Sequence, residues 1–159
     1  MKKIYLVVVI ASLFTSCLKN ETTCNYNECT LVAPASEISS VQAYLSANNI
    51  TATQHCSGLF YAVDNPGSGT KPNGCSTVAV NYEGKLTNGT TFDKTSAGQP
   101  ATFNLGNLIP GFRNGTLQIK NGGKVRLYIP PSLGYGSQQS GSIPGNSILI
   151  FTIELVGVQ

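Results

Sequence analysis

The sequence predicts an α+β fold in which an antiparallel β-sheet packs against one short helix. Its 159 residues include 17 glycines and 8 prolines, a composition typical of a strand-rich chain with many turns. Asn88-Gly89 is a strong signal for a tight turn between two antiparallel strands. The helix expected to start at Pro110 and to run to about Ile119 is too short to connect strands of a large parallel sheet. We therefore expect helix and sheet to form two layers around one core.

Segments with the pattern of strands recur from Gly58 onward. Val78, Val80 and Tyr82 alternate with small or polar residues, which is the period of two expected for a strand with one buried face. Residues 147–156 carry large apolar side chains at every second position and are the strongest candidate for a core strand. Six segments carry strand patterns, and five or so strands are expected from them: 58–63, 78–83, 91–93, 100–105, 124–129 and 147–156.

A short helix is expected before the first strand. Ser36 can cap its start through the side-chain hydroxyl, and Ile38, Val41 and Leu45 then lie on one helical face. Asn48-Asn49 can end it in a left-handed turn, which gives a helix of about 11 residues. We expect this helix to be a packing extension of the domain, and a helix that binds a partner is the alternative.

The first residues have the pattern of an export signal. Lys2-Lys3 form a basic start, residues 4–14 are apolar but too short to span a bilayer comfortably, and small residues precede Cys17. The pattern resembles a bacterial lipobox, although its leucine stands one position early. The sequence predicts a lipoprotein signal peptide over 1–16 and lipidation of Cys17, which would anchor the exported protein to a membrane facing the periplasm or the cell exterior. The alternative is an ordinary signal peptide cleaved near Ser16.

Export makes disulfides possible, and the four remaining cysteines form an even set. Cys24, Cys29, Cys56 and Cys75 allow three connectivities, among which proximity in the sequence favours Cys24–Cys29 and Cys56–Cys75. A metal site is the rival interpretation, but the chain has no CxxC spacing and only one histidine. We expect that histidine, His55, to be a surface residue, and we expect no metal and no cofactor.

Several classes of function are disfavoured by what the chain lacks. The net charge is only +3 and no basic run follows the first residues, so nucleic-acid binding is not indicated. The sequence contains no Gly-x-Ser-x-Gly elbow and no phosphate-binding loop with its Lys-Ser/Thr pattern. Its one histidine has no obvious catalytic partner. A nucleophilic hydrolase or a nucleotide-dependent enzyme is therefore not expected.

The stretch 105–112 is apolar, yet it contains Gly106, Pro110 and Gly111, which suits a loop that leads into a helix with proline near its first position. Backbone N–H groups at such a helix start are free to donate hydrogen bonds. Large apolar and aromatic residues elsewhere can line a small cup beside it, with the Asp93 carboxyl and the Tyr135 hydroxyl as sparse polar points. These cup residues are Tyr82, Phe92, Leu108, Ile109, Phe112, Tyr135, Ile143 and Phe151. The alternative is a loop that only packs inward.

An ordered set of motifs resembles the FKBP-type peptidyl-prolyl isomerases. The first is Val78-x-Val80-x-Tyr82-x-Gly84-x-Leu86-x-Asn88-Gly89-x-x-Phe92-Asp93. The rest follow in order as Phe103-x-Leu105, Leu108-Ile109-Pro110-Gly111-Phe112, Gly122-Gly-Lys-Val, Ile129-Pro-Pro, Tyr135-Gly136, Ile143-Pro144 and Leu149-Ile-Phe151-x-Ile-Glu-Leu155. The resemblance covers about residues 58–156. Together with the pattern of the first residues, it predicts a signal peptide over 1–16, a tether and short helix over 17–57, and an isomerase domain over 58–159.

The resemblance implies an antiparallel half-barrel wrapped on one helix, with a prolyl pocket between them. It assigns Asp93, Tyr135 and Phe112 as catalytic residues and Tyr82, Phe92, Leu108, Ile109, Ile143 and Phe151 as substrate-binding residues. Phe112 is the floor, where the family usually has tryptophan. Further departures are Ala101, where many members have a larger residue, Ser142, where isoleucine is frequent, and Gly145, where a second proline is common. These departures bear on affinity and substrate preference more than on fold.

The implied activity is acceleration of X–Pro bond rotation in exported proteins. A dry, apolar pocket can bind the twisted amide better than either planar form, which is all that catalysis requires here. The Ile109 N–H and the Tyr135 hydroxyl would hold substrate carbonyls, and Asp93 would orient polar neighbours. Asp93 as a general acid or base is the rival role. The alternative function is a non-catalytic module on the same scaffold that binds proline-containing peptides or acts as a chaperone, and a purely structural lipoprotein is disfavoured.

Overall fold

The computed structural model describes residues 24–159, so the expected signal peptide over 1–16 and the lipidation site Cys17 lie outside the described residues. The helices are α1 (Ala35–Ala47), α2 (Pro110–Thr116) and the short 3-10 helices η1 (Leu105–Asn107) and η2 (Pro131–Leu133). The strands are β1 (Thr53–Gln54), β2 (Phe60–Asn65), β3 (Thr77–Leu86), β4 (Thr91–Lys94), β5 (Ala101–Asn104), β6 (Lys124–Ile129) and β7 (Leu149–Val158). No helix within 24–159 is long and apolar enough to cross a membrane.

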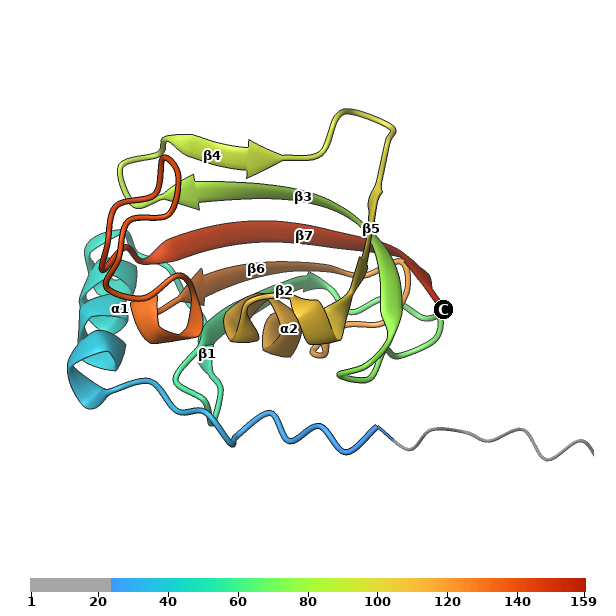
Figure 1. Ribbon diagram of the computed structural model, residues 1–159, viewed down its shortest axis with the longest axis horizontal. Coiled ribbons are helices and arrows are strands. Elements are labelled where there is room, and N and C mark those ends of the chain that lie inside the picture. The colour runs from blue at the N-terminus through green and yellow to red at the C-terminus, as the bar shows by residue number, and fades with distance from the viewer. Residues whose placement is uncertain (1–23) are drawn as a thin grey trace, which may run out of the picture.

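The strands form one sheet in the order β1-β2-β6-β7-β3-β4, with β5 paired to β3 outside this path. All of these pairings are antiparallel. Figure 1 shows the curved sheet lying over α2. The predicted α+β fold, with an antiparallel sheet around one short helix and a further helix before it, is therefore confirmed. Strand β1 was not predicted, because two residues are too few to show an alternation.

The two helices pack on opposite faces of the sheet. Leu127 and Ile129 of β6 are buried on the face that carries α2, whereas Tyr128 lies between them in the strand and points to the other face. There Tyr128 forms a small cluster with Val41 and Leu45 of α1. Helix α1 is therefore a packing element, as expected, and it buries one end of the outer sheet surface.

Helix α2 lies close to β6 because two glycines face that strand. A Cβ atom at Gly111 would overlap the side chain of Ile129, and one at Gly115 would overlap that of Leu127. Glycine in a helix costs about 1 kcal/mol relative to alanine, so this close approach is obtained at the expense of helix stability. The spacing of four residues places both glycines on one side of the helix, and this fixes which side of α2 remains available for the functional site.

The helix ends differ from the predictions in two places. Ser36 is not the cap of α1: Pro34 precedes the helix, its carbonyl accepts the N–H groups of Glu37 and Ile38, and no side chain caps the N-terminal start of the helix. The helix does end in a left-handed turn, since Asn49 has a φ of 53°. Helix α2 ends at Thr116 rather than near Ile119, because the chain continues beyond it in tighter turns, with the Ile119 N–H donating to the Thr116 carbonyl.

The predicted disulfide pairing was wrong. The bonds join Cys24 to Cys75 and Cys29 to Cys56, across 51 and 27 sequence positions. Residues 24–34, here called the strap, lie across the domain instead of folding back on themselves. The paired Cα atoms are therefore only 5.8 and 5.6 Å apart, within the range a disulfide needs. Proximity in the sequence failed because partners far along the chain lie close in the fold.

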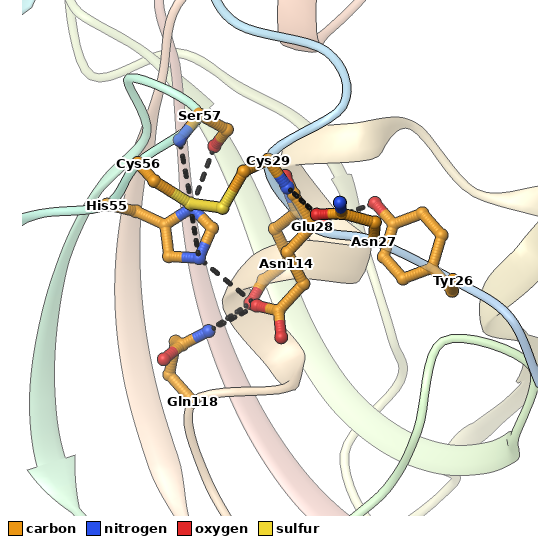
Figure 2. A network of polar contacts seen from close by, with 9 residues as sticks. All are labelled: Tyr26, Asn27, Glu28, Cys29, His55, Cys56, Ser57, Asn114 and Gln118. Carbon is orange, nitrogen blue, oxygen red and sulfur yellow. Dashed lines mark hydrogen bonds and ion pairs between the residues drawn. A yellow bond between two sulfur atoms is a disulfide. The ribbon is translucent and has the colours of Figure 1, made fainter.

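His55 is not an isolated surface residue, as Figure 2 shows. Its side chain is only 11% exposed, with Nε2 lying 3.1 Å from Glu28 Oε2 and Nδ1 lying 2.9 Å from Ser57 Oγ. Gln118 also donates to Glu28 Oε2 at 2.8 Å, so the strap glutamate joins His55 to the segment after α2. The sequence prediction missed this arrangement because Glu28 precedes His55 by 27 positions.

A second set of polar contacts ties the strap to α2 itself. Asn114 is 1% exposed, and its Nδ2 donates to the Glu28 carbonyl at 3.0 Å while its Oδ1 accepts a hydrogen bond from the Tyr26 hydroxyl. Ala33 of the strap is also buried in the main core. The strap is therefore part of the folded domain in the region that the structure describes.

Candidate functional site

A cavity of about 290 Å³ opens between α2 and the concave face of the sheet. It is lined mainly by aromatic and aliphatic side chains, with one carboxyl group and two phenol groups, which is the composition expected of a small-ligand or peptide-side-chain pocket. The lining residues are Tyr82, Asp93, Phe103, Asn107, Leu108, Ile109, Phe112, Tyr135 and Phe151.

The floor of the cavity is a set of interlocking aromatic rings. Phe112, from the first turn of α2, is 4% exposed and meets Phe151 of β7 edge to face at 5.2 Å between ring centroids. It meets Tyr82 of β3 in the same manner at 5.9 Å. Edge-to-face contacts of this kind are favourable beyond the area that they bury. The floor ring is therefore fixed by two strands that are themselves paired in the sheet.

A short hydrogen bond crosses one wall of the cavity. The Tyr82 hydroxyl donates to Asp93 Oδ2 at 2.6 Å, which joins β3 to β4 beside the aromatic floor. Burial, reinforced by this hydrogen bond and by the negative charge of Asp93, raises the pKa of Tyr82 well above its ordinary value. The phenol therefore stays neutral and keeps donating, and the carboxyl group that accepts from it is held in one orientation.

Tyr135 stands at the rim of the cavity. It is 44% exposed, and burial of the remainder, followed by the Asp93 charge, raises the pKa of its phenol. The Tyr135 hydroxyl makes no hydrogen bond within residues 24–159, so it is available to a ligand. Both phenols of the cavity are thus neutral hydrogen-bonding groups at ordinary pH.

The loop into α2 presents an unused backbone donor next to the floor. Pro110 occupies the first helical position, as predicted, and Ile109 precedes it with an extended backbone (φ −54°, ψ 142°). The Leu108 N–H donates to the Leu105 carbonyl at 3.2 Å, but in the part of the chain that the structure describes no acceptor lies opposite the Ile109 N–H. A ligand carbonyl in the cavity is a suitable acceptor for that group.

Seven of the nine predicted catalytic and substrate-binding residues line this one cavity. They are Tyr82, Asp93, Leu108, Ile109, Phe112, Tyr135 and Phe151. Phe92 does not line it, because its ring packs edge-on against Phe151 at 5.4 Å and supports the wall from behind. Ile143 is also absent from the lining, being buried to 6% exposure in the core. The structure places these residues, and their roles remain predictions.

Two lining residues were missed as site residues. Phe103 of β5 pairs with Val78 of β3 and so shares a face with Tyr82, whose ring lies 5.9 Å away. The two-residue period of strands was the signal that could have placed it there. Asn107, at the end of η1, carries no such signal, since its position depends on how the loop between β5 and α2 folds.

The comparisons with known proteins agree with this geometry. A sequence model of the FKBP-type peptidyl-prolyl cis-trans isomerases matches residues 68–156, more than half of the chain. FkpA of Aeromonas hydrophila, an FKBP-type peptidyl-prolyl cis-trans isomerase, is 40% identical over 123 residues, covering 74% of this chain and 45% of that protein. FkpA of Escherichia coli K12 is 45% identical over 103 residues, covering 64% of this chain and 38% of that protein.

Solved structures show the same likeness. The crystal structure of FkpA from Escherichia coli gives a TM-score of 0.71 at 38% identity, covering 79% of this chain and 60% of that one. The structure of a peptidyl-prolyl cis-trans isomerase from Pseudomonas syringae gives a TM-score of 0.68 at 29% identity, covering 80% of this chain and 97% of that one. The chain spans less than half the length of the curated relatives named above. Its fold, its ordered motifs and the matched region together show that the chain belongs to the FKBP-type peptidyl-prolyl cis-trans isomerase family.

Proposed function

We propose that this chain is an active peptidyl-prolyl cis-trans isomerase whose substrates are proline-containing segments of exported proteins. The observation that carries the proposal is the cavity itself, in which an aromatic floor at Phe112 lies beside the unpaired Ile109 N–H and the free Tyr135 hydroxyl. An apolar ring with an adjacent carbonyl, the shape of an X–Pro unit, matches this arrangement.

The reaction needs no bond to be made or broken. Rotation about an X–Pro amide crosses a barrier of about 18–20 kcal/mol, because amide resonance is lost as the bond twists. The twisted amide is less polar across its C–N bond than the planar forms, so an apolar site favours it relative to water. Binding the twisted form more tightly than either planar form accelerates the rotation in both directions.

Each group of the cavity has a role in this scheme. The Phe112 ring supports the pyrrolidine ring from below, the Ile109 N–H donates to a substrate carbonyl, and the Tyr135 hydroxyl donates to a second one. Asp93 accepts from Tyr82 and so holds the wall beside the amide in a fixed geometry. The rival role of Asp93 as a general acid or base is not required, since amide rotation transfers no proton.

The test is the isomerisation rate of an X–Pro tetrapeptide with the full chain and with variants of the cavity. Phe112→Ala should lower kcat/KM more than tenfold, because the support under the ring is lost, and Asp93→Leu should lower it severalfold. Tyr135→Phe should cost two- to fivefold, about 0.5–1 kcal/mol for one hydrogen bond. Tyr44→Phe, which removes a hydroxyl from α1 on the opposite face of the sheet, is the matched control. Failure of the folded wild-type chain to accelerate isomerisation would reject the proposed enzymatic function.

A non-catalytic module that binds proline-containing peptides is the second candidate, favoured by one observation. The floor is a phenylalanine, smaller than the tryptophan usual in the family and without an N–H. Tight binding of a proline-containing peptide to the cavity without acceleration of its isomerisation would establish this candidate instead.

Export and membrane anchoring are part of the same proposal. The four cysteines within 24–159 are all paired, and such disulfides persist in oxidising compartments outside the cytosol. The basic start, the apolar run and Cys17 support a lipoprotein signal over 1–16, a tether from Cys17 and a domain that faces the periplasm or the cell exterior. Mass spectrometry of the membrane-extracted protein tests this, and an unmodified Cys17 would contradict the lipid anchor.

A further inference from the structure

A second cavity, of about 280 Å³, lies between the strap and the start of α2. Its lining combines polar strap side chains with two residues of α2 and contains no carboxylate. The lining residues are Asn25, Tyr26, Asn27, Thr30, Leu31, Pro110 and Arg113. None of the roles proposed above for the prolyl cavity uses them.

Arg113 is the charged group of this cavity, and no residue within 24–159 accepts a hydrogen bond from its side chain. Its guanidinium carbon lies 3.8 Å from the centroid of the Tyr26 ring, a stacked cation–π contact. The Nε atom is enclosed and makes no hydrogen bond, and none of the ion pairs found within residues 24–159 involves Arg113. The ring beneath it is itself fixed, because the Tyr26 hydroxyl donates to Asn114. Within the residues that the structure describes, a planar cation is thus held in place without a carboxylate partner.

The two cavities share the first turn of α2. Ile109 and Phe112, three residues apart, line the prolyl cavity, whereas Pro110 and Arg113, one position further on, line the second. A step of one residue rotates about 100° around a helix, so the two pairs lie on adjacent sides of the same turn. The linings of the two cavities therefore meet at this turn, within the reach of one extended peptide.

We propose that Arg113, stacked on Tyr26, forms a specificity subsite for an acidic residue two to four positions from the substrate proline. This inference rests on the proposed isomerase function and names the preferred substrate class. A helix is about 10 Å across and an extended chain advances about 3.3–3.6 Å per residue, so about three residues bridge the two cavities. A carboxylate suits a guanidinium because its two oxygens match the planar fork of N–H donors.

The experiment compares two X–Pro peptides of equal length, one with glutamate and one with glutamine three positions from the proline. Versions with this residue before and after the proline are both measured, with the full chain solubilised in mild detergent. Wild type should give a higher kcat/KM for glutamate, by about three- to tenfold in at least one version, mainly through a lower KM. The preference should shrink as salt is added, because the pair is partly exposed.

Variants identify the group responsible. Arg113→Gln should reduce the glutamate/glutamine ratio to near one, and Arg113→Lys, which keeps the charge but loses the planar fork, should leave an intermediate ratio. Lys120→Gln removes one positive charge from an exposed position that lines neither cavity and should leave the ratio unchanged. Since each ratio is measured within one protein preparation, a partial loss of folded protein cancels.

Three results would overturn the inference. Equal acceleration of both peptides by wild type rejects the subsite and leaves the isomerase function standing. A wild-type preference that survives in Arg113→Gln, or disappears equally in Lys120→Gln, shows that Arg113 is not its source. The absence of acceleration with any peptide rejects the proposed function and the subsite together.

Discussion

Helix α2 contacts the prolyl cavity on one side and the strap on another, and the two contacts differ in chemistry. On the cavity side, Phe112 is held by ring contacts with Phe151 and Tyr82, which come from neighbouring strands of one sheet. On the strap side, Asn114 makes hydrogen bonds to a segment that two disulfides attach to the domain. The first contact fixes the geometry of the site directly, and the second fixes the helix that carries it.

This difference indicates that the cavity side should control activity and stability together, whereas the strap side should control mainly stability. Aromatic packing depends on burial and shape, which solution redox conditions do not alter. The strap depends on covalent bonds and hydrogen bonds, which can be removed one at a time. Substitutions on each side of α2 therefore separate the two contributions.

The largest effect is expected for Phe112→Ala. Removing a phenylalanine at 4% exposure costs about 3–5 kcal/mol of unfolding free energy, and the catalytic floor is lost with it. Phe103→Ala makes the same chemical change at the partly exposed edge of the same cavity and should cost clearly less. Denaturant unfolding and peptide isomerisation, measured on both variants, check this order. Equal losses of unfolding free energy and of isomerisation rate in the two variants would show that Phe112 contributes no more than Phe103 at the edge of the cavity.

The next effect is expected from opening the Cys29–Cys56 bond. Replacing both cysteines with serine releases a loop closed across 27 positions and should lower the unfolding free energy by about 3 kcal/mol. While the protein remains folded, kcat/KM for a neutral tetrapeptide should change less than twofold. Denaturant titration of the double variant measures the change in unfolding free energy. A large fall in kcat/KM of the folded variant would mean that the strap also shapes the prolyl cavity.

A smaller effect is expected for Asn114→Ala. The change leaves the Glu28 carbonyl and the Tyr26 hydroxyl without their partner in a partly buried place, at a cost of about 1–3 kcal/mol. Gln118→Ala, which removes a less buried donor to Glu28, should cost less. Thermal unfolding of both variants tests this order of stability losses. A larger loss for Gln118→Ala would mean that the strap is held mainly by the segment after α2 and not by α2 itself.

The smallest effect concerns pH. The pKa values of Tyr82 and Tyr135 are raised in the folded protein, so the folded state holds these protons more tightly than the unfolded state, where tyrosine titrates near pH 10. Their contribution to stability is complete below about pH 10 and is lost as the pH rises further. Ultraviolet titration should show late ionisation of these phenols, and Tyr82→Phe should flatten the alkaline loss of stability. Ionisation of both phenols near pH 10 would contradict the partial burial of these rings and the Tyr82–Asp93 hydrogen bond.

The sequence predicted the cavity better than it predicted the strap. Pro110 at the helix start and the alternation through Tyr82 are local signals, so the fold and most of the lining could be inferred from them. The Cys29–Cys56 bond and the contact between His55 and Glu28 join segments 27 positions apart without any repeating pattern. The bond and the contact both depend on how the strap lies on the folded domain. No short stretch of sequence predicts that placement. Asn107 was missed for the same reason.

The position of β7 has a consequence for the order in which the protein can be assembled. This strand, Leu149–Val158, comes after all the other described strands in the chain, yet it lies in the middle of the sheet between β6 and β3. Until β7 has been synthesised, β3 and β6 have no common neighbour and the core over α2 stays open. The domain can therefore close only once β7 has been made and has entered the sheet between β6 and β3.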